Sequence, residues 1–78
     1  MSSKYPPITA KDAIYVLKKL GYEQVSQKGS HKQFKKNNQG AKVTVADHGN
    51  DVIMNKTFSS ILSQIGIDKD EFYNNLKS

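Results

Sequence analysis

The two histidines of the chain, His31 and His48, are the side chains best suited to acid–base chemistry. Histidine changes its protonation near neutral pH, so it can take a proton from a reacting group and later return it. His31 directly follows Gly29 and Ser30. A glycine lets a phosphate backbone approach closely, and nearby ammonium groups can stabilise the charge of a pentacoordinate phosphorus. These residue types fit proton transfer at a ribose 2′-hydroxyl; the structural alternative is a turn histidine bonded only to its neighbours.

Positive charge is concentrated around His31. Of the 78 residues, twelve are lysine and none is arginine, against seven acidic residues, which gives a net charge of +5. No acidic residue lies between Glu23 and Asp47. Such a basic stretch favours an anionic partner. The lysine ammonium is a compact charge without the planar fork of arginine, so it suits binding to phosphates better than recognition of base edges. The residues predicted to bind phosphate are Lys28, Gly29, Ser30, Lys32, Lys35, Lys36 and Lys42.

Other chemistries have less support in the sequence. Asp47, His48 and Asp51 could together bind a metal ion, but there is no cysteine and no pair of histidines at helical spacing. Ser30 is a poor nucleophile for His31, because neighbours along a strand point to opposite faces. The glycines form no phosphate-binding loop for a nucleotide cofactor. We therefore expect no metal and no cofactor, with His48 as an auxiliary residue that could orient the substrate.

The pattern of apolar residues predicts the elements that position these side chains. A helix is predicted over residues 9–20, with Thr9 as its N-cap and Asp12 as the acid of a capping box. Three strands follow over residues 22–27, 31–36 and 41–45, joined by turns at 28–30 and 37–40. After a loop over 46–51, a second helix is predicted with Asn55 or Thr57 as its N-cap and an end before Gly66. A short third helix is predicted over 68–77, with Phe72 and Leu76 as its apolar pair.

This order of elements predicts an α+β fold. Helices on one face of a three-stranded antiparallel sheet would cover the apolar stripes in an αβββα sandwich, the order of double-stranded-RNA-binding domains (dsRBDs). Residues 1–78 are expected to form one domain, with a core over about 9–67 and a helical extension over 68–77. No apolar run is long enough for a membrane span, and a cytoplasmic location without membrane partners is expected.

The ordered motifs resemble the HicA toxin family over roughly residues 10–67. The likeness is carried by Gly21-Tyr22 after the first helix, the run Gly29-Ser30-His31-Lys32-Gln33-Phe34, the strand Val43-Thr44-Val45, the His48 loop and the helix from Phe58 to Ile67. The resemblance implies a dsRBD-like fold, metal-independent cleavage of mRNA and neutralisation by a HicB-type antitoxin. It places the family's catalytic histidine on His31, with Gly29 and Ser30 as its companions.

The leading hypothesis is thus an endoribonuclease toxin of a type II toxin–antitoxin pair, with His31 as acid, base or both in turn. One alternative is a non-catalytic RNA-binding module or inactive toxin relative that uses the same basic surface. Another is a protein-interaction unit whose basic surface meets only an acidic antitoxin.

Overall fold

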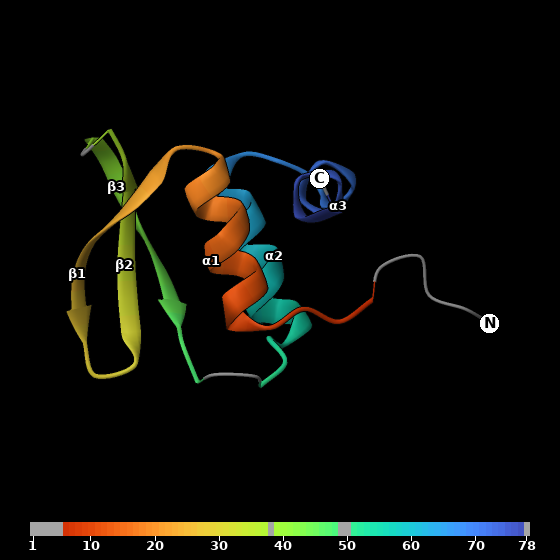
Figure 1. The fold of residues 1–78 in the computed structure, drawn as a ribbon, viewed down its shortest axis with the longest axis horizontal. Coiled ribbons are helices and arrows are strands. Elements are labelled where there is room, and N and C mark those ends of the chain that lie inside the picture. The colour runs from red at the N-terminus through yellow and green to blue at the C-terminus, as the bar shows by residue number, and fades with distance from the viewer. Residues whose placement is uncertain (1–5, 38, 49–50, 78) are drawn as a thin grey trace.

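The computed structural model describes residues 6–37, 39–48 and 51–77. Its elements are α1 (Ala10–Lys19), β1 (Tyr22–Lys28), β2 (His31–Lys36), β3 (Gln39–Ala46), α2 (Asn55–Ile65) and α3 (Lys69–Lys77). Figure 1 shows α1 and α2 on the same side of the sheet, with α3 beyond them on the side away from the strands. The predicted α+β, dsRBD-like αβββα sandwich with a short C-terminal helix is confirmed.

The sheet is an antiparallel meander in the order β1-β2-β3. The pairing of β1 with β2 shifts between Gln24 and Ser26, so that Val25 forms a bulge in the outer strand. The pairing of β2 with β3 also shifts, because Phe34 is opposite Val43 whereas Lys36 is opposite Gln39. β3 consequently begins two residues earlier than the predicted 41–45 strand, after a tight turn in which Asn37 adopts a positive φ of 53°.

The core lies between the sheet and the helices. The sheet contributes Phe34, Val43 and Val45, which are 0–2% exposed. The predicted alternation of β3 is thereby confirmed for both valines, whereas the side chain of Ala41 lies outside the described part of the chain. The helices and their flanks complete the core with Ile8, Ala10, Ala13, Val16, Leu17, Phe58, Ile61, Leu62, Phe72 and Tyr73.

The two helices on the sheet begin differently. Thr9 caps α1 in a reciprocal capping box, since the Asp12 N–H donates to Thr9 Oγ1 (3.3 Å) and the Thr9 N–H donates to Asp12 Oδ2 (2.9 Å). For α2 the prediction of Asn55 or Thr57 as cap is wrong, because its N-cap is Met54 and makes no side-chain cap. α2 starts there because the Ile53 N–H donates to the Ile8 carbonyl (2.8 Å), which fixes the chain just before the helix.

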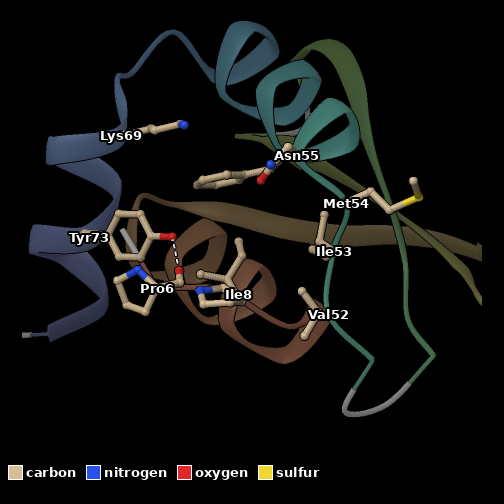
Figure 2. A pocket seen from close by; sticks show the side chains of 10 residues that line it. Pro6, Ile8, Val52, Ile53, Met54, Asn55, Lys69 and Tyr73 are labelled. Carbon is tan, nitrogen blue, oxygen red and sulfur yellow. Dashed lines mark hydrogen bonds between the residues drawn. The ribbon is translucent and has the colours of Figure 1, made fainter. Parts of the chain in front are cut away.

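The third helix belongs to the core. Phe58 of α2 packs edge-on against Phe72 and Tyr73, with ring centroids 4.9 and 6.0 Å apart. The Tyr73 hydroxyl donates a hydrogen bond to the Pro6 carbonyl, which joins α3 to the segment before α1 (Figure 2). Asp68 caps the start of α3 by accepting from the Glu71 N–H (2.9 Å). The buried Tyr73 was not predicted, since the pattern of Phe72 with Leu76 indicated a narrower apolar stripe.

Candidate active site on the open face of the sheet

The turn before His31 is fixed by hydrogen bonds on both sides. Gly29 has a φ of 60° whereas Ser30 does not enter the left-handed region, which fits a type II′ hairpin turn. The Gln27 side-chain amide donates to the Gly29 carbonyl (2.9 Å). The Asp47 N–H donates to the Ser30 carbonyl (2.7 Å), so the end of β3 is tied to this turn. His31 therefore starts β2 from an anchored position.

His31 lies on the sheet face that the helices leave uncovered. Its side chain is exposed, and its cross-strand neighbours are Lys28 on one side and Ala46 on the other. Paired residues of neighbouring strands share a face, and the buried Phe34 marks the opposite, helix-covered face. We call the uncovered side the open face; it carries Glu23, Ser26, Lys28, His31, Gln33, Lys35, Lys42, Thr44 and Ala46.

The structure divides the five lysines predicted to bind phosphate into two groups. Lys28 and Lys35 lie on the open face with His31. Lys42 lies there too, because it is exposed and precedes the buried Val43 on β3. Lys28 is the cross-strand neighbour of His31, whereas Lys35 stands opposite the acidic Glu23 at the other end of the strand pair. The positive charge of the open face is therefore least compensated at the His31 end.

Lys32 and Lys36 belong to the helix-covered face. Lys32 alternates with His31 along β2 and its Nζ forms an ion pair with Asp47 Oδ2 at 2.7 Å. The Lys36 side chain lies over Gly21, at the end of the sheet away from His31. The sequence could have indicated that these two lysines lie apart from His31. Side chains alternate along a strand, so Lys32 and Lys36 share the face of the apolar Phe34.

His48 is not brought onto the open face with His31. It is exposed and lines a pocket of about 250 Å³ between the end of β3 and the start of α2, together with Asp51, Thr57 and Ile61. Within the described residues, no three or more His, Asp or Glu side chains gather closely enough to hold a metal ion. Asp47, which the sequence offered as a possible metal ligand, instead forms an ion pair with Lys32.

A large concavity lies on the helix side of the molecule. It has a volume of about 640 Å³ and is walled by the segment 6–8, the segment 52–55 and α3 (Figure 2). Its lining is mostly apolar and includes Phe58 of α2 and Lys69 of α3. It contains neither histidine and none of the residues predicted to bind phosphate, so the acid–base candidates and the large groove are separate features.

Comparison with known proteins identifies the class of this chain. The family model described as the HicA toxin of bacterial toxin–antitoxin systems matches residues 10–67. That match covers α1, the sheet and α2, and the chain belongs to the HicA toxin family. It is therefore a toxin of a toxin–antitoxin pair, for which an antitoxin is the expected partner. No curated protein matches the chain. In the described part of the structure, no helix is long and apolar enough to cross a membrane.

Proposed function

We propose that this toxin is an endoribonuclease that binds RNA on the open face and moves protons with His31. The observation that carries the proposal is the position of His31: it is exposed at the end of an uncovered sheet face, beside Lys28 and behind an anchored glycine turn. A phosphate can approach such a turn closely, and the ammonium group of Lys28 favours the charge that develops on it.

The reaction that suits these groups is transesterification within the RNA chain. His31 takes the proton of a ribose 2′-hydroxyl, and the 2′-oxygen forms a bond to the adjacent phosphorus as the bond from phosphorus to the 5′-oxygen breaks. The same imidazole then returns the proton to the departing 5′-oxygen. The products are a 2′,3′-cyclic phosphate and a 5′-hydroxyl, and neither step requires a metal ion.

The proposed RNA contacts follow the division of the lysines. Lys28, Lys35 and Lys42 bind successive phosphates, with the Gly29-Ser30 turn beside the scissile one. Lys32 is already held by Asp47 and contributes less. The sheet strands present no aromatic side chain on the open face, because Tyr22 and Phe34 belong to the helix-covered face. RNA is therefore bound through its backbone rather than by stacking on a platform.

The antitoxin is proposed to be of HicB type and to cover the open face. An acidic or apolar surface seated over His31 and the three open-face lysines would block RNA by occupying its place. The open face carries three lysines against one acidic residue, Glu23, so an acidic partner is favoured there.

Replacing His31 by alanine should abolish cleavage of a defined mRNA by the purified protein. The reaction is run in chelator, and the product ends are read for cyclic phosphate and 5′-hydroxyl groups. His48→Ala is the matched control, because it removes an exposed imidazole at a distinct place, and it should retain cleavage. Undiminished cleavage by a folded His31→Ala protein would contradict the proposed role. Wild-type cleavage that needs added Mg²⁺ would contradict metal independence, and RNA binding without turnover would support a non-catalytic module.

A further inference from the structure

The segment just before α2 carries two exposed apolar side chains, Val52 and Met54, which we call the apolar ridge. Val52 is 59% and Met54 is 75% exposed, whereas Ile53 between them packs against the core. Hydrogen bonding holds this segment in place, because Val52 forms a bridge with Thr9 and the Ile53 N–H donates to the Ile8 carbonyl (2.8 Å). Successive side chains of an extended segment point to opposite sides, so the inward Ile53 keeps the ridge directed outward.

The apolar ridge borders two hollows. The groove of about 640 Å³ beside α3 and the pocket of about 250 Å³ at the end of β3 both include Val52 and Met54 in their lining. Figure 2 shows the ridge on the side of the groove opposite Tyr73. Single exposed apolar side chains are common on protein surfaces. Two of them on an anchored segment, beside hollows that can receive a partner's side chains, are typical of a protein-binding surface.

The apolar ridge adjoins the end of the sheet where His31 lies. Ala46 is the cross-strand neighbour of His31, and it lines the smaller pocket together with both residues of the ridge. A protein that is seated over His31 and reaches past the end of β3 therefore meets the ridge. The other large apolar side chains that are exposed in the described chain, Tyr15 and Val25, lie on α1 and on β1, and β1 is separated from β3 by β2.

The chemistry of the open face makes an apolar anchor outside it necessary for tight protein binding. The residues that make up the open face are charged or polar apart from Ala46. Charged contacts steer and select a partner, whereas a few well-packed anchors in desolvated pockets contribute most of the affinity. Among the described residues that line the larger hollow there is Lys69 but no acidic side chain. The surface therefore fits a partner with apolar side chains and nearby carboxylates.

We propose that the antitoxin of this toxin–antitoxin pair anchors on the apolar ridge, with apolar side chains in the two hollows. This inference rests on the proposed binding of the antitoxin to the open face, since it is the continuity between that face and the ridge that selects this partner. The two surfaces have different roles: the open-face lysines attract the antitoxin, and the ridge holds it.

The test measures the affinity of the purified antitoxin for toxin variants by isothermal titration calorimetry. Val52→Thr combined with Met54→Gln makes both ridge side chains polar at similar size. This ridge variant should raise the Kd about tenfold, in about 1 M salt as well as in about 0.1 M salt, because salt does not screen apolar contacts. Replacing Lys28, Lys35 and Lys42 by glutamine should raise the Kd chiefly at the lower salt concentration, where charges are screened least.

Tyr15→Gln is the matched control, because it makes polar an exposed side chain of α1 that lines neither hollow, and it should leave the Kd unchanged. An unchanged Kd for a folded ridge variant, with a loss of affinity in the lysine variant, would overturn the anchor and leave the open-face proposal standing. Unchanged affinity in both variants would overturn both. Slower RNA cleavage by the ridge variant, or a toxin dimer that it converts to a monomer in sedimentation, would assign the ridge to RNA or to a second copy and overturn the inference.

Discussion

At the scale of single residues, Tyr73 shows how one side chain couples two distant segments. Its ring is buried against Phe58 and Phe72, and its hydroxyl donates to the Pro6 carbonyl. Burial raises the pKa of the Tyr73 hydroxyl above its ordinary value of 10, and the negative charge of Asp12 raises this pKa further. The folded protein therefore favours the neutral phenol, which can donate to Pro6, over the phenolate, which cannot.

This raised pKa predicts a loss of stability at alkaline pH. Below pH 10 the phenol is protonated in both states, and the stabilisation by Tyr73 is fully present. Above pH 10 the unfolded chain releases the proton while the folded chain retains it, so the free energy of unfolding falls as pH rises toward the folded-state pKa. Tyr73→Phe should be less stable than wild type at pH 8 and lose less stability between pH 9 and 11, as measured by urea unfolding.

Tyr15→Phe is the control for this measurement. Tyr15 is 48% exposed and its ring lies near the Lys19 ammonium group rather than in the core. Its substitution should leave the alkaline slope close to that of wild type. An equal slope for wild type and Tyr73→Phe would show that the Tyr73 hydroxyl does not contribute to the alkaline sensitivity.

The residues of the candidate site were predicted from sequence to different degrees. His31 and its glycine turn follow from local patterns, because a turn glycine and the start of a strand are encoded within a few residues. The ion pair of Lys32 with Asp47 was missed, since it joins β2 to the end of β3 and needs the register of two strands. The Ser26–Gln33 bond was missed for the same reason, and also because the bulge at Val25 determines which β1 residue faces Gln33.

At the scale of elements, α3 is the helix whose buried face the sequence predicted least completely. The apolar pair of Phe72 and Leu76 indicated a helix with one narrow stripe, and the structure confirms the helix over Lys69–Lys77. The additional burial of Tyr73 depends on Phe58 and Pro6, which are distant along the chain, so no local pattern could indicate it. The same applies to α2, whose start is fixed by Ile53 bonding to Ile8 rather than by a cap.

Because α3 completes the aromatic core, Phe72→Ala should destabilise the whole domain. Phe72 is fully buried, and truncation of a buried phenylalanine costs about 3–5 kcal/mol, a large part of the stability of a small domain. Urea unfolding followed by circular dichroism measures the change. Leu76→Ala on the same helix should cost less, since Leu76 is only partly buried. A cost below about 1 kcal/mol for Phe72→Ala would make α3 a dispensable addition to the family-matched residues.

At the scale of the whole molecule, the helices cover one face of the sheet and the other is left to solvent (Figure 1). The large apolar groove lies on the helix side, while His31 and three lysines lie on the open face. Composition alone could indicate a basic protein but not this separation, because it arises from the alternation of three paired strands.

The separation predicts which lysines set the salt dependence of RNA binding. In a non-cleaving His31→Ala background, replacing Lys28, Lys35 and Lys42 together by glutamine should lower the slope of log affinity against log salt by about 2, since each phosphate that a lysine neutralises on a single strand adds roughly 0.7. Binding is followed by fluorescence anisotropy over a salt series. The variant should keep the wild-type circular-dichroism spectrum, since all three side chains are on the open face.

A charge-matched control places the three substitutions on the helix side. Lys11, Lys18 and Lys56 are exposed residues of α1 and α2, and their replacement by glutamine lowers the net charge by the same amount. This variant should retain most of the slope. If instead its slope falls as far as that of the open-face variant, RNA is bound by overall charge or by the helices, and the open face is not the RNA surface.

The bulge at Val25 has a consequence for how copies of this protein meet. β1 is an outer strand that pairs with β2 alone in the described chain, so its other edge bears unpaired N–H and C=O groups that could template strands from other molecules. The extra residue interrupts the regular row halfway along, and the charged Glu23 and Lys28 flank the interruption. The bulge and the two charges therefore disfavour pairing of the β1 edge with a strand of another copy.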